Sequence, residues 1–337
     1  VLFRSDGAVG PLGLPALLGL WPRQTAPALA QWVRTNVQKG RISRGTLRLA
    51  PGAASAPFKP GAAAADPPLQ VGPLAGLSLD LELQDLQVTP LTGFVPVTAE
   101  TARLRLDGGR LELTTGQARL PLPSGRQVAL KDPRLTMSAV AGANSMAEVV
   151  LQSSGPAGTL LELLDQEPFG LLRDIGVDAQ TLDGKSETTI RASFPVNPGV
   201  AIADIKVEGR IRVTDMRSKG VLGGWDISGG TLLLGLTDKA LDAKGDILVA
   251  GVPARISWQR IFNAAADRQP PARLTATLDA SDRDMLGLSL NHMVQGEVPV
   301  VLTLQQDGQG QTTAQIEANL GSAELLIETM AWRKAPG

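Results

Sequence analysis

The feature that most constrains this chain is a period of two in its apolar residues, which starts near Leu77 and recurs almost to the C-terminus. Successive side chains of a β-strand point to opposite faces of a sheet, so this period is typical of strands with one apolar and one polar face. Turn signals such as Asp107-Gly108-Gly109 and Asp307-Gly308 separate several runs and predict antiparallel hairpins. The alternate apolar positions are Leu77, Leu79, Leu81 and Leu83; Leu104 and Leu106; Leu111 and Leu113; Leu120 and Leu122; Val128 and Leu130; Ile190, Ala192 and Phe194; Ile211 and Val213; Leu232, Leu234 and Leu236; Ile247 and Val249; Ile256 and Trp258; Leu274, Ala276 and Leu278; Val298, Val300, Leu302 and Leu304; Ala314, Ile316, Ala318 and Leu320; and Leu325 and Ile327.

Two segments follow helical spacing instead. In the first, Thr25 can cap a helix that ends before Gly40, and the second begins at Thr159 with capping-box spacing. We therefore expect short helices near residues 25–39 and 159–172. The apolar positions of the first helix are Leu29, Trp32, Val33 and Val37.

The predicted fold class is mainly β, with one long twisted antiparallel sheet or two related sheets and two short helices. No alternation of strand and helix patterns is present, which argues against a doubly wound parallel sheet. A weak echo between Gly108-Gly109-Arg110-Leu111 and Gly229-Gly230-Thr231-Leu232 suggests two repeats. The predicted organisation is an N-terminal segment with a short helix (1–50), a Pro/Ala/Gly-rich loop (51–73), a first β repeat (74–158), a helical connector (159–176) and a second β repeat (177–337).

Composition excludes several function classes. The chain has 32 Lys and Arg against 33 Asp and Glu, a balance that argues against a nucleic-acid binder. It has no cysteine and one histidine, which rules out Cys/His zinc sites, cysteine nucleophiles and disulfides.

The strongest enzymatic pattern is Ala179-Gln-Thr-Leu-Asp-Gly-Lys185-Ser186, a relaxed form of the phosphate-binding loop. A working loop needs a strand before it and a helix after it, but the residues from Ser186 to Phe194 have a strand pattern. We therefore predict that Asp183-Gly184 is a turn entering a strand and that no nucleotide binds there.

Other catalytic patterns are incomplete. His292 is the only histidine, and the sequence has no nucleophile elbow that would accompany it. Asp279, Asp282 and Asp284 lack the glycine and distal glutamate of a calcium loop, and Arg283 between them favours a solvated turn. Paired carboxylates of a carbohydrate enzyme stay possible, although aromatics are only 3%. We predict no enzyme, no cofactor and no metal.

Short motifs along most of the chain resemble those of YhdP-type AsmA-like proteins of Gram-negative envelopes. Their order and spacing agree with that family, in which a long curved sheet forms a hydrophobic trough. The matching motifs are Trp21-Pro22 with Ala26-Pro27, Trp32-Val33, Asn36 and Lys39-Gly40; Gly176-Val177-Asp178 with Leu182, Gly184-Lys185 and Phe194-Pro195; Gly229-Gly230-Thr231-Leu232 with Gly245, Gly251-Val252-Pro253-Ala254, Trp258 and Phe262; and Ala323-Glu324-Leu325 with Trp332-Arg333-Lys334-Ala335-Pro336-Gly337.

The resemblance implies a non-enzymatic periplasmic segment of an inner-membrane-anchored protein that moves phospholipid toward the outer membrane. Since the sequence begins at Val1 and stops at Gly337, we expect a piece of a longer protein whose anchor lies outside it. The expected partners are phospholipid acyl chains and, for the full-length protein, membranes, with no nucleic acid and no nucleotide. The candidate lipid-lining residues are Leu79, Leu81, Leu83, Leu232, Leu234, Val300, Leu302 and Leu304.

Three alternatives stay open at this point. The same aliphatic residues could fill a closed core, since composition does not distinguish a core from an open trough. The related TamB-like group suggests a periplasmic scaffold for outer-membrane protein assembly, which would carry long uncharged edge strands. A carbohydrate-binding module would instead need a cleft with convergent carboxylates and aromatic rings.

Overall fold

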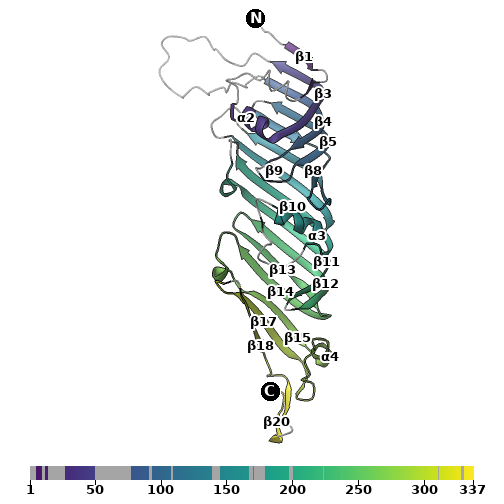
Figure 1. Cartoon of the computed structure of the whole chain (residues 1–337), viewed down its shortest axis with the longest axis vertical. Helices are drawn as coiled ribbons and strands as arrows, with labels where there is room; N and C mark the ends of the chain where they lie inside the picture. The colour runs from purple at the N-terminus through teal and green to yellow at the C-terminus, as the bar shows by residue number, and fades with distance from the viewer. Residues whose placement is uncertain are drawn as a thin grey trace, which may run out of the picture. The chain divides into compact units, whose positions relative to one another are not determined.

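Strands make up 64% of this computed structural model, and its described residues contain a large antiparallel sheet and three short helices (Figure 1). The mainly β fold class predicted from the period of two is confirmed. The structure describes residues 5–9, 12–13, 27–49, 77–90, 93–107, 109–138, 145–166, 170, 179–196, 200–222, 224–309, 311–327 and 330–337. The predicted loop at 51–73 lies outside them.

The chain divides into two compact units. Unit 1 comprises Val1–Ser153, Gln166–Phe169 and Thr189–Val207, and unit 2 comprises Ser154–Asp165, Gly170–Thr188 and Glu208–Gly337. The predicted first repeat falls almost entirely in unit 1, which also takes residues 189–207 from the predicted second repeat. The first helices and strands are β1 (Ser5–Val9), β2 (Leu12–Gly13), α2 (Pro27–Asn36), β3 (Val37–Leu49), β4 (Leu77–Val88), β5 (Val97–Asp107), β6 (Arg110–Thr114), β7 (Gln117–Pro121), β8 (Gln127–Ser138), β9 (Met146–Pro156), α3 (Ala157–Asp165) and β10 (Asp183–Pro195).

The remaining elements contain a second, small sheet, formed by β16, β19 and β20. In chain order they are the 3-10 turn Ile202–Asp204, β11 (Lys206–Leu222), β12 (Trp225–Thr237), β13 (Ala240–Val249), β14 (Val252–Ile261), the 3-10 turn Ala266–Arg268, β15 (Ala272–Leu278), α4 (Ala280–Met285), β16 (Val294–Gln295), β17 (Val298–Gln306), β18 (Thr312–Ala318), β19 (Glu324–Ile327) and β20 (Trp332–Lys334).

In unit 1, antiparallel strands from β3 to β9 pair in chain order, with β6 and β7 end to end between β5 and β8. The register places apolar residues side by side on five strands. Leu79 pairs with Leu106, and the row continues through Leu111 and Met137 to Ala147. Helix α2 lies on this face, and its Trp32 packs in one buried cluster with Leu106, Leu111, Met137 and Ala147.

In unit 2, an apolar ladder crosses seven strands. Its register runs from β11 through β12, β13, β14, β15 and β17 to β18. We call this the unit 2 ladder, and its members are Val213, Leu232, Gly245, Ile256, Leu274, Leu302 and Ile316. Helix α3 packs against it through Leu160 and Leu164, which are buried with Val213 and Leu274.

Strands β12 and β13 approach each other closely at Gly245, a member of this ladder. A Cβ atom on Gly245 would clash with the Thr231 carbonyl oxygen and lie 3.0 Å from Leu232 Cα. Gly230, with φ of 125°, faces Ile247 next to a register shift in β12. The shift and the positive φ are typical of a β-bulge, which bends a strand locally.

The helices differ from the predictions at their ends. The first helix stops at Asn36, whose side-chain amide donates to the Trp32 carbonyl over 2.9 Å, and Val37 starts β3 by pairing with Val88. The second helix is Ala157–Asp165; most of residues 166–172, and Thr25 at the first helix, lie outside the described residues. Helix α4 was not expected.

Two smaller expectations also need correction. The Gly229-Gly230 echo lies inside β12, whereas Gly109 is in the turn before β6, so the two segments are not structurally equivalent. Arg283 is buried rather than on a solvated turn. Asp279 and Asp282 form a capping box at the start of α4, which explains the acidic spacing.

Candidate functional site

The three lining candidates of unit 1 lie together on β4 but are covered. Leu81 and Leu83 are only 1% and 2% exposed, and Leu79 packs against the cluster that contains Trp32. Their cross-strand neighbours Leu106, Leu104 and Ala102 are apolar as well. Leu79 therefore belongs to a packed core between sheet and helix, and Leu81 and Leu83 are buried on the same strand.

The five candidates of unit 2 share one face of its sheet. Leu232 and Leu234 lie on β12 opposite Val213 and Ile211, and all are part of or packed on the cluster beneath α3. Leu302 and Leu304 on β17 also pack on this cluster, and Val300 precedes them on the same face. All five candidates are half-buried.

Exposure changes along the unit 2 ladder. Val213 and Leu274 are buried, Leu302 is half-buried, and Ile316 on β18 is 66% exposed. The aliphatic face is therefore closed under α3 and accessible at β17 and β18. Aliphatic surface without polar groups offers nonpolar contact but no directional recognition, which suits a hydrocarbon chain better than a polar substrate.

The other face of unit 1 is polar and carries ion pairs between neighbouring strands. Arg103 and Arg105 both contact Asp80, with N–O distances of 2.7 and 3.6 Å, and Arg134 contacts Glu112 over 3.3 Å. Hydrogen bonding from Arg103, opposed by partial desolvation, holds the pKa of Asp80 below its usual value. Both charge signs alternate among these described residues, so their charges largely neutralise one another.

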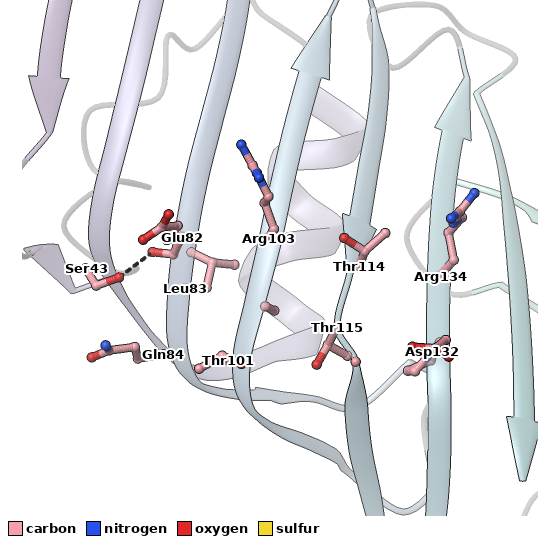
Figure 2. Close-up of a pocket in the computed structure, with 13 residues that line it drawn as sticks. Ser43, Glu82, Leu83, Gln84, Thr101, Arg103, Thr114, Thr115, Asp132 and Arg134 are labelled. Atoms are coloured by element: carbon pink, nitrogen blue, oxygen red, sulfur yellow. Dashed lines mark hydrogen bonds between the residues drawn. The ribbon is translucent and has the colours of Figure 1, made fainter.

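A hollow of about 700 Å³ lies on this polar face, where β6 ends and β7 begins (Figure 2). Asp132 in β8 has φ of 46°, and its amide donates to the Gly116 carbonyl over 3.0 Å, so a bulge in β8 matches the break between β6 and β7. Arg103 and Arg134 extend to the same side in Figure 2, while α2 passes behind the strands. Because both arginines are already paired with carboxylates, the described residues that line the hollow offer no unpaired cationic group.

A second hollow, of about 670 Å³, lies in unit 2. Its lining includes Leu248, Pro253 and Pro299, together with the ion pair of Arg255 and Asp246 at 3.0 Å. Asp246 and Arg255 are cross-strand partners one position away from Gly245 and Ile256, which places their side chains on the face opposite the unit 2 ladder.

The residues of the incomplete enzyme motifs are not gathered into a site. Lys185 is exposed on strand β10, and Ser186 is buried and donates to the Gly155 carbonyl over 3.1 Å. The predicted turn at Asp183-Gly184 is wrong in its position, because the turn is at residues 179–181 and β10 already begins at Asp183. The second half of the phosphate-loop pattern therefore lies in a strand. His292 is exposed. Within the described ranges, no group of three His, Asp or Glu side chains could hold a metal ion.

Arg283 is a buried cation that the sequence pattern did not reveal. Its guanidinium donates to the carbonyl oxygens of Leu278, Gly296 and Val294 at 2.9–3.1 Å and to Asn291 Oδ1 at 2.7 Å. These bonds tie α4 to the segment that leads into β16. Its role is structural, and the only sequence signal was one arginine between two aspartates.

None of the described helices is long and apolar enough to cross a bilayer. In comparisons with protein-family models, curated proteins and solved structures, the chain has no match. The resemblance to the AsmA-like family therefore stays an expectation from the sequence motifs.

Proposed function

We propose that this chain is a non-enzymatic segment of an envelope protein that carries phospholipid between the inner and outer membranes. Acyl chains would lie along the aliphatic face of the sheet while head groups stay toward solvent. The observation that supports this most is the unit 2 ladder, an apolar row across seven strands that is aliphatic except at Gly245 and accessible at Ile316. The family resemblance supports a periplasmic location and an inner-membrane anchor for the full protein.

The energetics favour a hydrocarbon ligand. Removing one methylene group of a ligand from water contributes about 0.8 kcal/mol to the free energy of binding. Partial burial of one acyl chain therefore outweighs most single polar contacts. Leu232, Leu302 and Ile316 differ little in chemistry, so neighbouring positions should bind an acyl chain with similar free energy. Similar energies at neighbouring positions permit movement along the row.

The placement of the candidates narrows the proposed path. Leu81 and Leu83 are buried in the sheet of unit 1, so they could contact lipid only after a rearrangement there. Leu302 and Leu304 on β17, beside exposed Ile316, are the better candidates for first contact.

A second candidate function is a scaffold that pairs with strands of outer-membrane proteins. All seven residues of β18 are exposed, and Glu317 is its only charged residue. Within the described residues, the strand registers pair β18 with β17 alone. Such a strand could extend its ladder with a strand from another protein.

The test of the proposed function is mass spectrometry of lipids that co-purify with the 337-residue chain, with circular dichroism to establish that it is folded. Phospholipid in amounts comparable to the protein is the expected result. A folded preparation that carries no phospholipid, and takes none up from phospholipid vesicles, would contradict lipid carriage. Pairing of β18 with an unfolded barrel protein would then favour the scaffold.

A further inference from the structure

Helix α3 covers part of the face that is proposed to carry lipid. Its Leu160 and Leu164 are buried in one cluster with Ile211 and Val213 of β11. Four of the lining candidates, Leu232, Leu234, Leu302 and Leu304, pack against that cluster. An acyl chain that enters at β18 and follows the ladder therefore meets α3.

The sheet beside α3 carries polar side chains that are buried without hydrogen-bond partners. Thr188 on β10 and Ser218 on β11 are 5% and 3% exposed. Neither Thr188 Oγ1 nor Ser218 Oγ has a partner in the part of the chain that the structure describes. Ser218 faces Ile227, a member of the α3 cluster.

Thr188 is connected to α3 through its neighbour on β10. Side chains two positions apart lie on the same face of a strand, so Thr188 shares its face with Ser186. Ser186 donates to the carbonyl of Gly155, two residues before α3 begins. Thr188 therefore lies on the face of β10 whose Ser186 contacts the end of β9, directly before α3, and Ser218 lies beside the α3 cluster.

A buried hydroxyl without a partner destabilises the conformation that buries it, because its bonds to water are lost and not replaced. The helix itself has nine residues, too few to be stable in isolation. Its position thus depends on apolar contacts that the two hydroxyls oppose. Both features lower the free energy needed to move α3 off the sheet.

We propose that α3 is a displaceable cover of the unit 2 ladder: seated, it protects the aliphatic face, and lifted, it admits an acyl chain beyond β17. This inference rests on the proposed function and adds a regulatory step to it. Lifting α3 returns Thr188 and Ser218 to water and exposes Leu232 and Leu234. An acyl chain then replaces the contacts that Leu160 and Leu164 made.

The chain has no cysteine, so single cysteines can report on this motion. Leu160→Cys places a thiol under α3, and Leu241→Cys places one in the sheet of the same unit, where Leu241 is 2% exposed. If α3 lifts without unfolding of the sheet, N-ethylmaleimide should label the helix thiol at least about tenfold faster than the sheet thiol. Vesicles of phosphatidylethanolamine and phosphatidylglycerol should raise the labelling rate of Leu160→Cys further and leave that of Leu241→Cys unchanged.

The hydroxyls are tested in the Leu160→Cys background. Thr188→Val and Ser218→Ala together remove the unpartnered groups, which should slow labelling about tenfold or more by stabilising the seated helix. Ser186→Ala is the matched control, since it removes a hydroxyl that has a partner and should speed labelling. Thermal melting establishes that each variant is folded.

Separate outcomes overturn the cover and the proposed function. Equal labelling rates for the thiols in Leu160→Cys and Leu241→Cys would show that α3 stays packed on the sheet, even if phospholipid binds. A labelling rate of Leu160→Cys that phospholipid binding leaves unchanged would also overturn the cover. Absence of bound phospholipid would instead overturn lipid carriage, while faster labelling of the helix thiol than of the sheet thiol would still show that α3 lifts.

Discussion

Arg103 spans both carboxylate oxygens of Asp80 across β4 and β5: Nε donates to Oδ1 over 2.8 Å and Nη2 donates to Oδ2 over 2.7 Å. Bidentate arginine–carboxylate contacts are the strongest of the common ion pairs. This one lies on the polar face of unit 1, opposite the residues that pack on α2. It therefore helps to fix which face of β4 is buried, because a shift by one residue would exchange Asp80 with Leu81.

The Asp80 contact predicts a specific response to acid. Hydrogen bonding from Arg103 lowers the pKa of Asp80 in the folded state, so its stabilising effect is present above the unfolded pKa of about 3.9. The effect is lost as the pH falls through the lower, folded pKa. The melting temperature of wild type should exceed that of Asp80→Asn at neutral pH, and the gap should close in acid.

The expected gap is small and sensitive to salt, since both side chains are at least one third exposed. Thermal melts of both proteins over a pH series, at low and high salt, provide the measurement. A gap that is the same at every pH would show that Asp80 contributes through packing and not through its charge.

Leu302→Asp tests whether the unit 2 ladder is open. If α3 can lift and β17 is accessible, the new carboxylate stays hydrated, so the fold should survive with less bound phospholipid. In a permanently closed core the same carboxylate would be desolvated without a partner. It would then lower the free energy of unfolding by several kcal/mol or more.

Thr303→Asp is the matched control, because Thr303 is the next residue on β17 and pairs with Arg273 and Gln315 on the opposite face. It should keep both stability and lipid. Thermal melting and lipid content are measured on the same preparations. A folded Leu302→Asp protein with undiminished lipid would remove Leu302 from the lining.

Gly245→Val tests the close approach of β12 and β13. A side chain at this position would clash with the backbone of Thr231 and Leu232. We therefore expect the free energy of unfolding to fall by about 1–3 kcal/mol or more. Gly235→Ala on β12 is the control, since its added Cβ would meet nothing within 4 Å. Urea unfolding measures both, and equal stabilities would show that the two strands can separate without penalty.

Arg283→Met tests the buried cation. The carbonyls of Leu278, Gly296 and Val294 would each lose a charged donor. We therefore expect the free energy of unfolding to fall by on the order of 3 kcal/mol. Exposed Arg273→Met should change stability by less than about 0.5 kcal/mol. Hydrogen exchange of residues 280–296 should rise in the first variant alone; unchanged exchange would mean that α4 is held by other contacts.

Lys185→Ala addresses the phosphate-loop pattern. Because Lys185 is exposed on a strand, its removal should change the free energy of unfolding by less than about 0.5 kcal/mol. Isothermal calorimetry should detect no ATP binding in either protein. Micromolar binding of ATP that Lys185→Ala abolishes would contradict this interpretation.

Most strands after Pro73 could be predicted from the sequence because their signal is local. Leu302 and Leu304 alternate with polar or outward residues within one strand, and turn residues mark its end. Strand β9 was missed because Val149, Val150 and Leu151 are consecutive apolar residues, and alternation is lost where both faces are apolar.

Local patterns did not predict which strands the helices α2 and α3 pack against. Trp32 and Leu106 share a buried cluster although more than seventy positions separate them, and Leu164 shares one with Leu274 across more than a hundred positions. Helical spacing shows that α2 and α3 have an apolar side but not which strands it contacts. The burial of Leu81 and Leu83, in contrast to exposed Ile316, follows from such long-range packing.

In unit 2, each strand from β12 to β15 pairs with the strand that directly precedes it in the chain. Every new ladder then closes only a short loop, which limits the entropy lost at each step and favours sequential folding as the chain is synthesised. Because each strand is added at the edge of the sheet, a further hairpin could lengthen such a sheet in the way that an added repeat lengthens a repeat protein.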